Sequence, residues 1–263
     1  MTAAEPTEPA PVHTRRERQR RATMAEIVAV SRRLLGDPQG ISLRSIATEM
    51  GMTAPALYRY VDSYEDLIYR VAADIYDDLV ATLETARDRH PTDDPAAQIV
   101  AASAAFRQWA LAHRTEFGLI FTSTMTSVTT DGQKICAEAG LRFGALFSDM
   151  FVRVWQATGF AVPGDDELDR TLRERLRSRA AEHSDFHESW RSDDVPLGLQ
   201  WHFLRIWSRL YGTVTLEVYE HIDTAIVESG ALFRDMIADC GREMGLADQA
   251  DRLRGVLEVE LAR

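Results

Sequence analysis

The chain has 263 residues, of which 45% are hydrophobic, which suffices for one large or two modest domains whose core could enclose a ligand. It contains no run of roughly 18 uncharged apolar residues, and residues 1–21 are polar where a signal peptide would be apolar, so we expect a cytoplasmic protein with no membrane partner. The two cysteines, Cys136 and Cys240, lie far apart in the sequence, which predicts reduced thiols.

The net charge of −11 is unevenly distributed along the chain. Residues 1–62 contain nine arginines and seven acidic residues, a balance of +2, whereas residues 63–263 carry −13. A basic N-terminal segment followed by an acidic remainder would concentrate the attraction for phosphate at one end of the molecule. It would also discourage non-specific DNA binding elsewhere.

Helical periodicity runs through almost the whole chain and predicts an all-α fold. Residues 1–13 are proline-rich and are expected to form a disordered tail. The first helix begins at Thr14 or at Thr23, because a glutamate follows each threonine at capping-box spacing. The pattern does not choose between these two starts, and the helix ends at residues 36–40.

Further helices follow at regular intervals. Ser42 caps a second helix that Gly51 ends, and a third is expected at residues 53–60. A long helix then begins after Ser63 and runs to about Arg87. Later turn signals leave helices at 95–113, 115–125, 133–158, 166–183, 198–222, 224–245 and 248–262.

Residues 43–62 fit a helix-turn-helix unit at the positions where packing is most demanding. Ala47 lies four residues before Gly51, so a small side chain faces the point where the two helices cross. Gly51 can adopt the positive φ of a tight turn. Ile46 and Leu57 would fill the wedge between the helices. On this spacing alone, an ordinary helical hairpin with a glycine turn remains an alternative.

The segment GISLRSIATEMGMTAPALYRYVDSYEDL resembles the N-terminal domain of the TetR family of transcriptional regulators. The resemblance implies a three-helix DNA-binding domain, whose fourth helix leads into an all-helical domain for ligand binding and dimerisation. The matching positions are Gly40, Ile46, Ala47, Gly51, Leu57, Tyr58, Tyr60 and Leu67.

The resemblance also implies which residues contact DNA. Tyr58 and Tyr60 stand where the family places phosphate contacts, for which a phenol is a suitable donor. Arg44 stands where some members read guanine and others contact phosphate. Small residues at the start of the third helix favour thymine methyl groups in the major groove. The predicted DNA-contacting residues are Arg44, Thr53, Ala54, Ala56, Tyr58, Arg59, Tyr60 and Tyr64.

Tyr64 departs from the family pattern, which usually has a phosphate-anchoring lysine at this position. Its hydroxyl can still donate, and the free N–H groups at the start of the following helix face the same phosphate. Asp62, Glu65 and Asp66 would weaken the attraction. The phosphate contacts would then depend more on the arginines 15, 16, 18, 20 and 21, for which a solvated basic helix start is the alternative.

Large apolar residues recur at spacings of three or four in the rest of the chain. For any single residue, this spacing is more typical of core packing than of a ligand site. Because members of the TetR family hold a mostly apolar cavity between such helices, the whole set predicts a site for a small, largely apolar effector. The candidate lining residues are Trp109, Phe121, Phe147, Phe151, Trp155, Trp201 and His202.

The run from Trp207 to Glu217 resembles a C-terminal signature of actinobacterial TetR members, which implies dimerisation through a four-helix interface. Gly212 would allow the helices to approach closely. Glu217 needs a partner if it is buried. The candidate interface residues are Leu210, Tyr211, Val214, Val218, Phe233 and Ile237.

No serine, cysteine or histidine combination has the sequence context of a nucleophile, and there is no glycine-rich phosphate loop, so we do not expect an enzyme. One polar cluster has the composition of a metal site, but it leads into a predicted loop, so we expect no metal. Its members are His183, Asp185, His187 and Glu188.

These observations divide the chain into a tail, a helix-turn-helix domain, a ligand-binding and dimerisation domain, and a C-terminal tail that can be helical. The respective ranges are 1–13, 14–62, 63–246 and 247–263. The leading hypothesis is a homodimeric, ligand-responsive repressor that binds a palindromic double-stranded DNA operator and uses no cofactor. The alternative is a helical protein that binds a ligand or partner and whose DNA binding is incidental.

Overall fold

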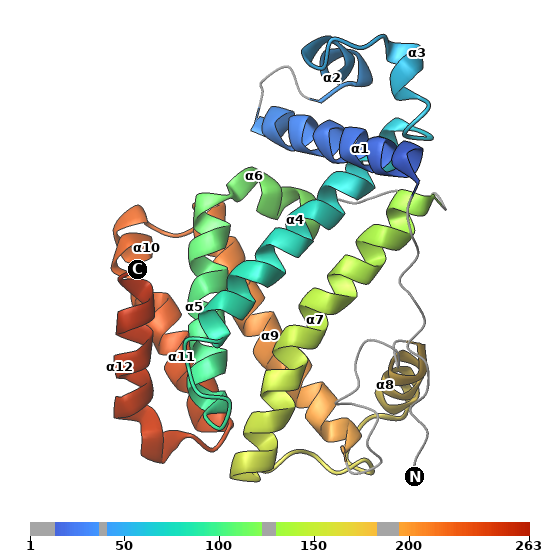
Figure 1. The fold of residues 1–263 in the computed structure, drawn as a ribbon. Helices are drawn as coiled ribbons and strands as arrows, with labels where there is room; N and C mark the ends of the chain where they lie inside the picture. The colour runs from blue at the N-terminus through green and yellow to red at the C-terminus, as the bar shows by residue number, and fades with distance from the viewer. Residues whose placement is uncertain (1–13, 37–40, 123–129, 183–194) are drawn as a thin grey trace, which may run out of the picture.

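The computed structural model describes residues 14–36, 41–122, 130–182 and 195–263, and over these ranges it contains twelve α-helices and no strand (Figure 1). The predicted all-α fold class is confirmed. Three N-terminal helices lie across one end of a larger bundle, and α4 leads from the first group into the second (Figure 1). No helix in these ranges is both long enough and apolar enough to cross a membrane. The predicted tail at 1–13 lies outside the described residues.

The first group, called the head, consists of α1 (Arg15–Arg33), α2 (Leu43–Glu49) and α3 (Ala54–Leu57). α1 begins at the first of its two predicted starts. The Thr14 hydroxyl accepts a hydrogen bond from the Glu17 N–H at 3.2 Å, and the Glu17 carboxylate accepts one from the Thr14 N–H at 2.7 Å. This reciprocal capping box satisfies N–H groups that the helix itself leaves free.

A tight turn joins α2 to α3. The Ser42 hydroxyl caps α2, and Gly51 follows the helix with a φ of +63°. The Met52 N–H donates to the Ala47 carbonyl at 2.8 Å, and the Gly51 N–H donates to the Thr48 carbonyl at 3.1 Å. This is the hydrogen-bond pattern of a Schellman motif, so the predicted glycine turn is confirmed.

The third helix is shorter than the predicted range 53–60. α3 ends at Leu57, and the N–H groups of Arg59 and Tyr60 donate to carbonyls three residues earlier, at 3.3 and 2.9 Å. The chain therefore tightens from α-helical to 3₁₀-like bonding at this point. Tyr58, Arg59 and Tyr60 form a turn of their own, called the Tyr58–Tyr60 turn below.

α4 (Tyr64–Arg87) connects the head to the bundle. It begins after Ser63, whose hydroxyl accepts from the Asp66 N–H at 3.1 Å, and it ends at the predicted residue. α1 and α7 both pack against α4, so this helix is shared by the two parts of the molecule. Its fully buried large side chains are Leu67, Val71, Ile75, Leu79 and Leu83.

The second group, called the body, surrounds α5. Residues 96–107 of α5 are all buried, and α4 and α7 run side by side along the body (Figure 1). The predicted helix at 115–125 is replaced by α6 and a π-helical turn over Gly118–Thr122, and residues 123–129 lie outside the described ranges. The helices before the C-terminal part are α5 (Pro95–Ala112), α6 (Arg114–Phe117), α7 (Asp131–Thr158), α8 (Arg170–Glu182) and α9 (Leu197–Val218).

The C-terminal part of the body contains α10 (Thr224–Ser229), α11 (Ala231–Glu243) and α12 (Ala250–Leu261). The single helix predicted over 224–245 is broken at Gly230, which has a φ of +63° and lies between α10 and α11. The helix predicted near the C-terminus is confirmed as α12, which packs against α5. α12 therefore packs within the body.

Candidate DNA-binding surface and ligand cavity

The helix-turn-helix packs as its sequence predicts. Ile46 and Leu57 are fully buried and Ala47 is 3% exposed, so the small side chain lies where α2 approaches α3. Met50 and Met52 are partly buried beside them. This packing orients α3 and the Tyr58–Tyr60 turn relative to the rest of the head.

The predicted DNA-contacting residues lie on α2, on α3 with its N-cap, on the Tyr58–Tyr60 turn and at the first residue of α4. Tyr58 is 56% exposed and Tyr64 is 40% exposed, which leaves both rings accessible to a partner. Tyr60 is partly buried and packs against the core. The other exposed members are Arg44, Thr53 and Arg59, and the partly buried ones are Ala54 and Ala56.

The basic start of α1 lies against this surface. Arg20 donates from Nη2 to the carbonyl oxygen of Arg59 at 3.3 Å, which joins α1 to the Tyr58–Tyr60 turn. The structure therefore brings the basic helix start and the predicted DNA-contacting turn together. The five exposed arginines of this helix start are Arg15, Arg16, Arg18, Arg20 and Arg21.

The acidic residues near the turn are arranged differently from the expectation. Asp62 and Glu65 are exposed, but Asp66 is fully buried and accepts a hydrogen bond from Arg70 Nε at 2.9 Å. Burial raises the pKa of the Asp66 carboxyl, but hydrogen bonds from Arg70 and from the Gly132 N–H outweigh that effect and hold the pKa below its ordinary value. The Asp66 charge is thus paired inside the protein.

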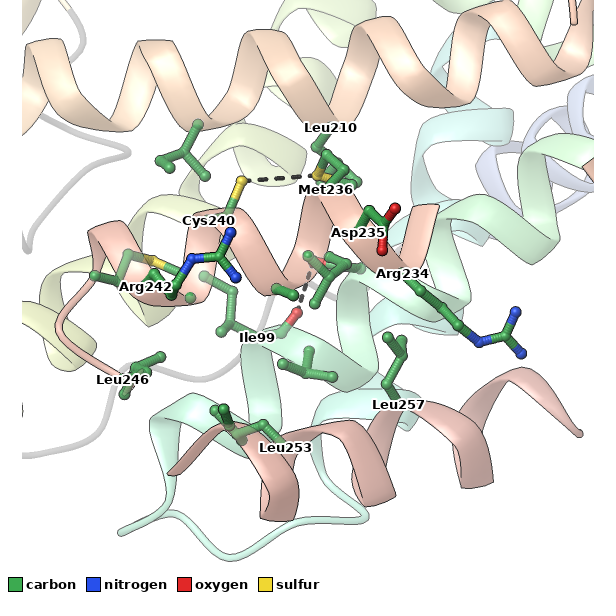
Figure 2. Close-up of a pocket in the computed structure, with 18 of the residues that line it drawn as sticks. Ile99, Leu210, Arg234, Asp235, Met236, Cys240, Arg242, Leu246, Leu253 and Leu257 are labelled. Atoms are coloured by element: carbon green, nitrogen blue, oxygen red, sulfur yellow. Dashed lines mark hydrogen bonds between the residues drawn. The ribbon is translucent and has the colours of Figure 1, made fainter. Parts of the chain in front are cut away.

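A cavity of about 330 Å³ lies in the body, lined by α5, α7, α9, α11 and α12 together with residues of the α11–α12 connection. Figure 2 shows Ile99, Leu246, Leu253 and Leu257 around the space between α11 and α12. Phe147 and Phe151 form the wall on the α7 side. The lining is mainly aliphatic and aromatic, so the cavity is suited to an apolar guest.

The three arginines of the cavity lining have acidic partners, and Asp235 is the acidic residue of the same lining. Arg234 binds Glu258 through two hydrogen bonds of 2.6 and 2.8 Å, which joins α11 to α12. Arg254 binds Asp251 at 3.1 Å, and Arg242 binds Asp239. These ion pairs neutralise the positive charge around the apolar space.

Of the predicted ligand residues, Phe147 and Phe151 line this cavity. Phe121 instead belongs to an aromatic cluster around Phe106, whose ring centroid lies 5.6–6.2 Å from five neighbouring rings. Trp109 is buried and stacks on the imidazole of His113, with centroids 5.1 Å apart. Trp155, Trp201 and His202 are not part of the cavity lining.

The residues that sequence reasoning missed come from the C-terminal helices. Met236 and Cys240 of α11 and Leu253 and Leu257 of α12 all line the cavity. Their apolar spacing was visible in the sequence, but it does not show which helix they face. Only the packing of α12 on α5 brings them together with α7.

His202 lies on α9 beside the cavity wall and is 6% exposed. Its ring stacks on Phe151, and its Nε2 lies 4.0 Å from Glu243 Oε2. Neither atom has a hydrogen-bond partner among the described residues. Burial, followed by the charge of Arg205, lowers the pKa of His202 below its ordinary value, against the opposing effect of Glu243.

Most of the predicted dimer residues pack within their own subunit. Val214 and Phe233 are fully buried, and Val218 is 1% exposed. Leu210 and Ile237 line the cavity. The Tyr211 hydroxyl donates to the Phe121 carbonyl at 3.0 Å. The exposed apolar side chains on this part of the chain are Leu216, Tyr219, Ile226 and Leu232.

Glu217 has the partner that its burial requires. Its carboxylate is 1% exposed and accepts hydrogen bonds from Arg107 Nε at 2.6 Å and from Arg107 Nη2 at 3.3 Å. Arg107 also donates to the Val227 carbonyl at 2.6 Å and lies over the ring of Phe233. This pair joins α5 to α9 and to the α10–α11 segment.

The predicted metal-like cluster at 183–188 lies outside the described residues. Within the described ranges, no group of three or more histidine, cysteine, aspartate or glutamate side chains is arranged to hold a metal ion.

An all-α chain with an exposed helix-turn-helix and a helical body that encloses an apolar cavity has the architecture of a bipartite transcriptional regulator. A sequence profile for the tetracyclin repressor-like C-terminal domain matches residues 99–240, which is more than half of the chain. The chain belongs to the TetR family of helix-turn-helix transcriptional regulators.

Known proteins agree with this assignment. The HTH-type transcriptional regulators Rv1816 of Mycobacterium tuberculosis and Mb1846 of Mycobacterium bovis are each 29% identical to this chain over 219 residues, which is 82% of this chain and 85% of the relative. The crystal structure of SCO4313, described as a regulatory protein, superposes with a TM-score of 0.60 at 25% identity. That match covers 86% of this chain and 98% of SCO4313.

Proposed function

We propose that the protein is a homodimeric, ligand-responsive repressor that binds a palindromic DNA operator. The observation that supports this function is an exposed helix-turn-helix surface and an apolar cavity of about 330 Å³ in one chain. Residues 14–62 contact DNA, and the body through α12 binds the effector and the second subunit. Effector binding shifts the dimer toward an arrangement of heads that fits the operator poorly.

The effector is small, uncharged and largely apolar. The cavity walls offer aliphatic, aromatic and sulfur-containing side chains, and the arginines beside them are already paired with acids. Ser103 and Cys240 are weakly polar groups of the lining, and the Asp235 carboxylate would disfavour an anionic effector. A free carboxylate would have to displace one of these ion pairs, so a neutral molecule is favoured.

The second subunit docks on the exposed face of α9 and α11. Leu216 and Leu232 are 42% and 38% exposed, and no atom approaches within 4 Å of the position that a Cβ on Gly212 would take. To bind a palindrome, such a dimer must hold its two Tyr58–Tyr60 turns at successive major grooves, about 34–36 Å apart.

DNA binding is tested with fragments from upstream of the protein's own gene in gel-shift titrations at several salt concentrations. The wild type should retain a fragment that contains a palindrome, with affinity that falls as salt rises. Replacing Arg44→Ala and Tyr58→Phe together should weaken retention at every salt concentration, and loss of the Arg44 charge from a phosphate should reduce the salt slope by about 1. Arg170→Ala, an exposed charge change on α8, is the matched control. Failure of the wild type to retain any upstream fragment at low salt would contradict the proposal.

The cavity is tested with the neutral fluorescent probe N-phenyl-1-naphthylamine, whose emission rises in an apolar site. Leu253→Trp places a larger side chain in the cavity lining and should weaken probe binding. Val259→Trp changes an exposed position on the same helix and should not. Equal probe affinity in Leu253→Trp and the wild type would show that the probe binds elsewhere and that this cavity is not a ligand site.

A further inference from the structure

Asp66 connects three parts of the molecule. It lies in the first turn of α4 and is fully buried. Its Oδ1 accepts a hydrogen bond from the Gly132 N–H at 2.7 Å, at the start of α7. Its Oδ2 accepts one from Arg70 Nε at 2.9 Å and a longer one from the Asp62 N–H at 3.4 Å. Asp62 comes two residues after the Tyr58–Tyr60 turn.

Gly132 makes the approach of α7 to α4 possible. A Cβ at this position would lie 2.4 Å from the backbone oxygen of Asp66 and 2.7 Å from Oδ1. The nearest atom belongs to the backbone, so it cannot rotate away as a flexible side chain would. Any larger residue at 132 must move α7 away from α4 or push α4 toward the head.

α7 reaches from this contact to the cavity. Phe147 and Phe151 on the same helix line the cavity wall. Gly132 and Phe147 are separated by about 22 Å along an α-helix that rises 1.5 Å per residue. α7 packs along α4 over much of this distance, so a displacement at the cavity end is carried to Gly132 by a continuous helix (Figure 1).

We propose that Asp66 is a positioning residue through which the N-terminus of α7 sets the position of the Tyr58–Tyr60 turn. The carboxylate holds the Gly132 and Asp62 N–H groups on its two oxygens, so movement of α7 moves the start of α4 and the segment that leaves the turn. This inference rests on the proposed DNA-binding function, and it names the contact through which the body acts on the head.

The test compares Gly132→Ala with Gly140→Ala in the full-length protein. Both variants add one methyl group to α7, but a Cβ at 140 meets only the Tyr76 ring at 3.7 Å, an ordinary contact. Hydrogen exchange followed by mass spectrometry measures the segment 53–66, and residues 250–261 of α12 serve as an internal reference. Fluorescence anisotropy measures the operator Kd at a temperature where all variants are folded.

Gly132→Ala should accelerate exchange in residues 53–66, leave α12 unchanged and alter the operator Kd by about fivefold or more, the usual scale of coupling between sites. Gly140→Ala should do neither. If residues 53–66 exchange at the same rate in Gly132→Ala as in the wild type, the inference is overturned. Equal effects of Gly132→Ala and Gly140→Ala on exchange would overturn it as well. If the wild type binds no operator, the proposed function fails, and the exchange comparison still decides whether α7 positions the turn.

A second variant separates positioning from general stability. Asp66→Asn keeps an oxygen for the Gly132 N–H but replaces the oxygen that accepts from Arg70 and Asp62. It should accelerate exchange at residues 58–63 more than at the start of α7. Accelerated exchange in all peptides alike would show that Asp66 serves only global stability and would contradict the positioning role.

Discussion

Glu217 lies in an apolar stretch of α9, and its partner Arg107 is 110 positions away on α5. The need for a partner could be inferred from the sequence, because an ionised carboxylate among apolar side chains is costly without one. The identity of the partner could not, because spacing on one helix carries no information about which other helix packs against it. The pair also depends on the Val227 carbonyl, which accepts from the same guanidinium.

Glu217→Gln should destabilise the protein by about 3–5 kcal/mol, because it leaves the Arg107 charge buried without its counter-ion. Urea unfolding followed by circular dichroism measures the change. Glu174→Gln removes one partner of an exposed pair with Arg170 and should change the free energy of unfolding by less than about 1 kcal/mol. A similar small change for both variants would show that the buried pair contributes little.

His202 should make stability depend on pH in the mildly acidic range. Its pKa is lowered in the folded protein by burial and by Arg205, so the unfolded chain binds the proton at a higher pH than the folded chain does. The free energy of unfolding should therefore decrease as pH falls below about 6.5, the ordinary pKa of histidine. The contribution of Asp66, whose pKa is lowered, is lost only at more acidic pH, below about 3.9.

Urea unfolding at pH values between about 7.5 and 5.5 measures this effect, since the window spans the ordinary histidine pKa. His202→Gln removes the titrating imidazole and should flatten the decrease in unfolding free energy over that window. The control is His221→Gln, which replaces a histidine at an exposed position. An unchanged slope in His202→Gln would mean that another group causes the pH dependence.

At the scale of elements, the predictions succeeded where local chemistry decides. Thr14, Ser42 and Ser63 each cap the helix that follows, and Gly51 ends α2 with a positive φ. These features depend on residues within four positions of each other. The predictions failed where the sequence does not distinguish a continuous helix from an interrupted one. At Gly230, the apolar periodicity continues across the break between α10 and α11.

Gly51→Ala should destabilise the head by roughly 1–2 kcal/mol, because a side chain disfavours the left-handed conformation. A Cβ at this position meets no atom within 4 Å, so the cost is conformational and not steric. Gly255→Ala also meets no atom within 4 Å but lies inside α12, where alanine should stabilise the helix by up to about 1 kcal/mol. Urea unfolding measures the change in unfolding free energy for both variants. Equal changes would contradict the claim that the α2–α3 turn requires the left-handed conformation at Gly51.

At the scale of the whole molecule, aromatic residues either fill the centre of the body or border the cavity, and Phe147 does both. Their spacing in the sequence does not distinguish the two roles. Phe106, Phe117, Phe121 and Phe143 pack on one another and fill the centre of the body. Phe147 and Phe151 lie one and two turns further along α7 and border the cavity. The difference arises because this part of α7 faces the space that α5, α11 and α12 border.

The proposed dimer face predicts the outcome of a charge substitution. Leu216→Arg places a cation on that face and should shift the protein from dimer toward monomer in sedimentation velocity. Ile135→Arg changes a similarly exposed apolar residue on α7 and should not. A dimer of unchanged affinity in Leu216→Arg would place the subunit contact on another face.

The sequence by itself determined most of the helices, the caps at Thr14, Ser42 and Ser63, the glycine turn and the TetR resemblance of the head, because each depends on neighbours along the chain. It also indicated an apolar body suited to a ligand. Only the tertiary structure decided that α12 completes the cavity wall, that Arg107 pairs with Glu217, and that Asp66 turns inward to meet α7. The reason is physical: a helical repeat specifies which residues share a face, whereas the packing of the whole chain specifies what that face meets.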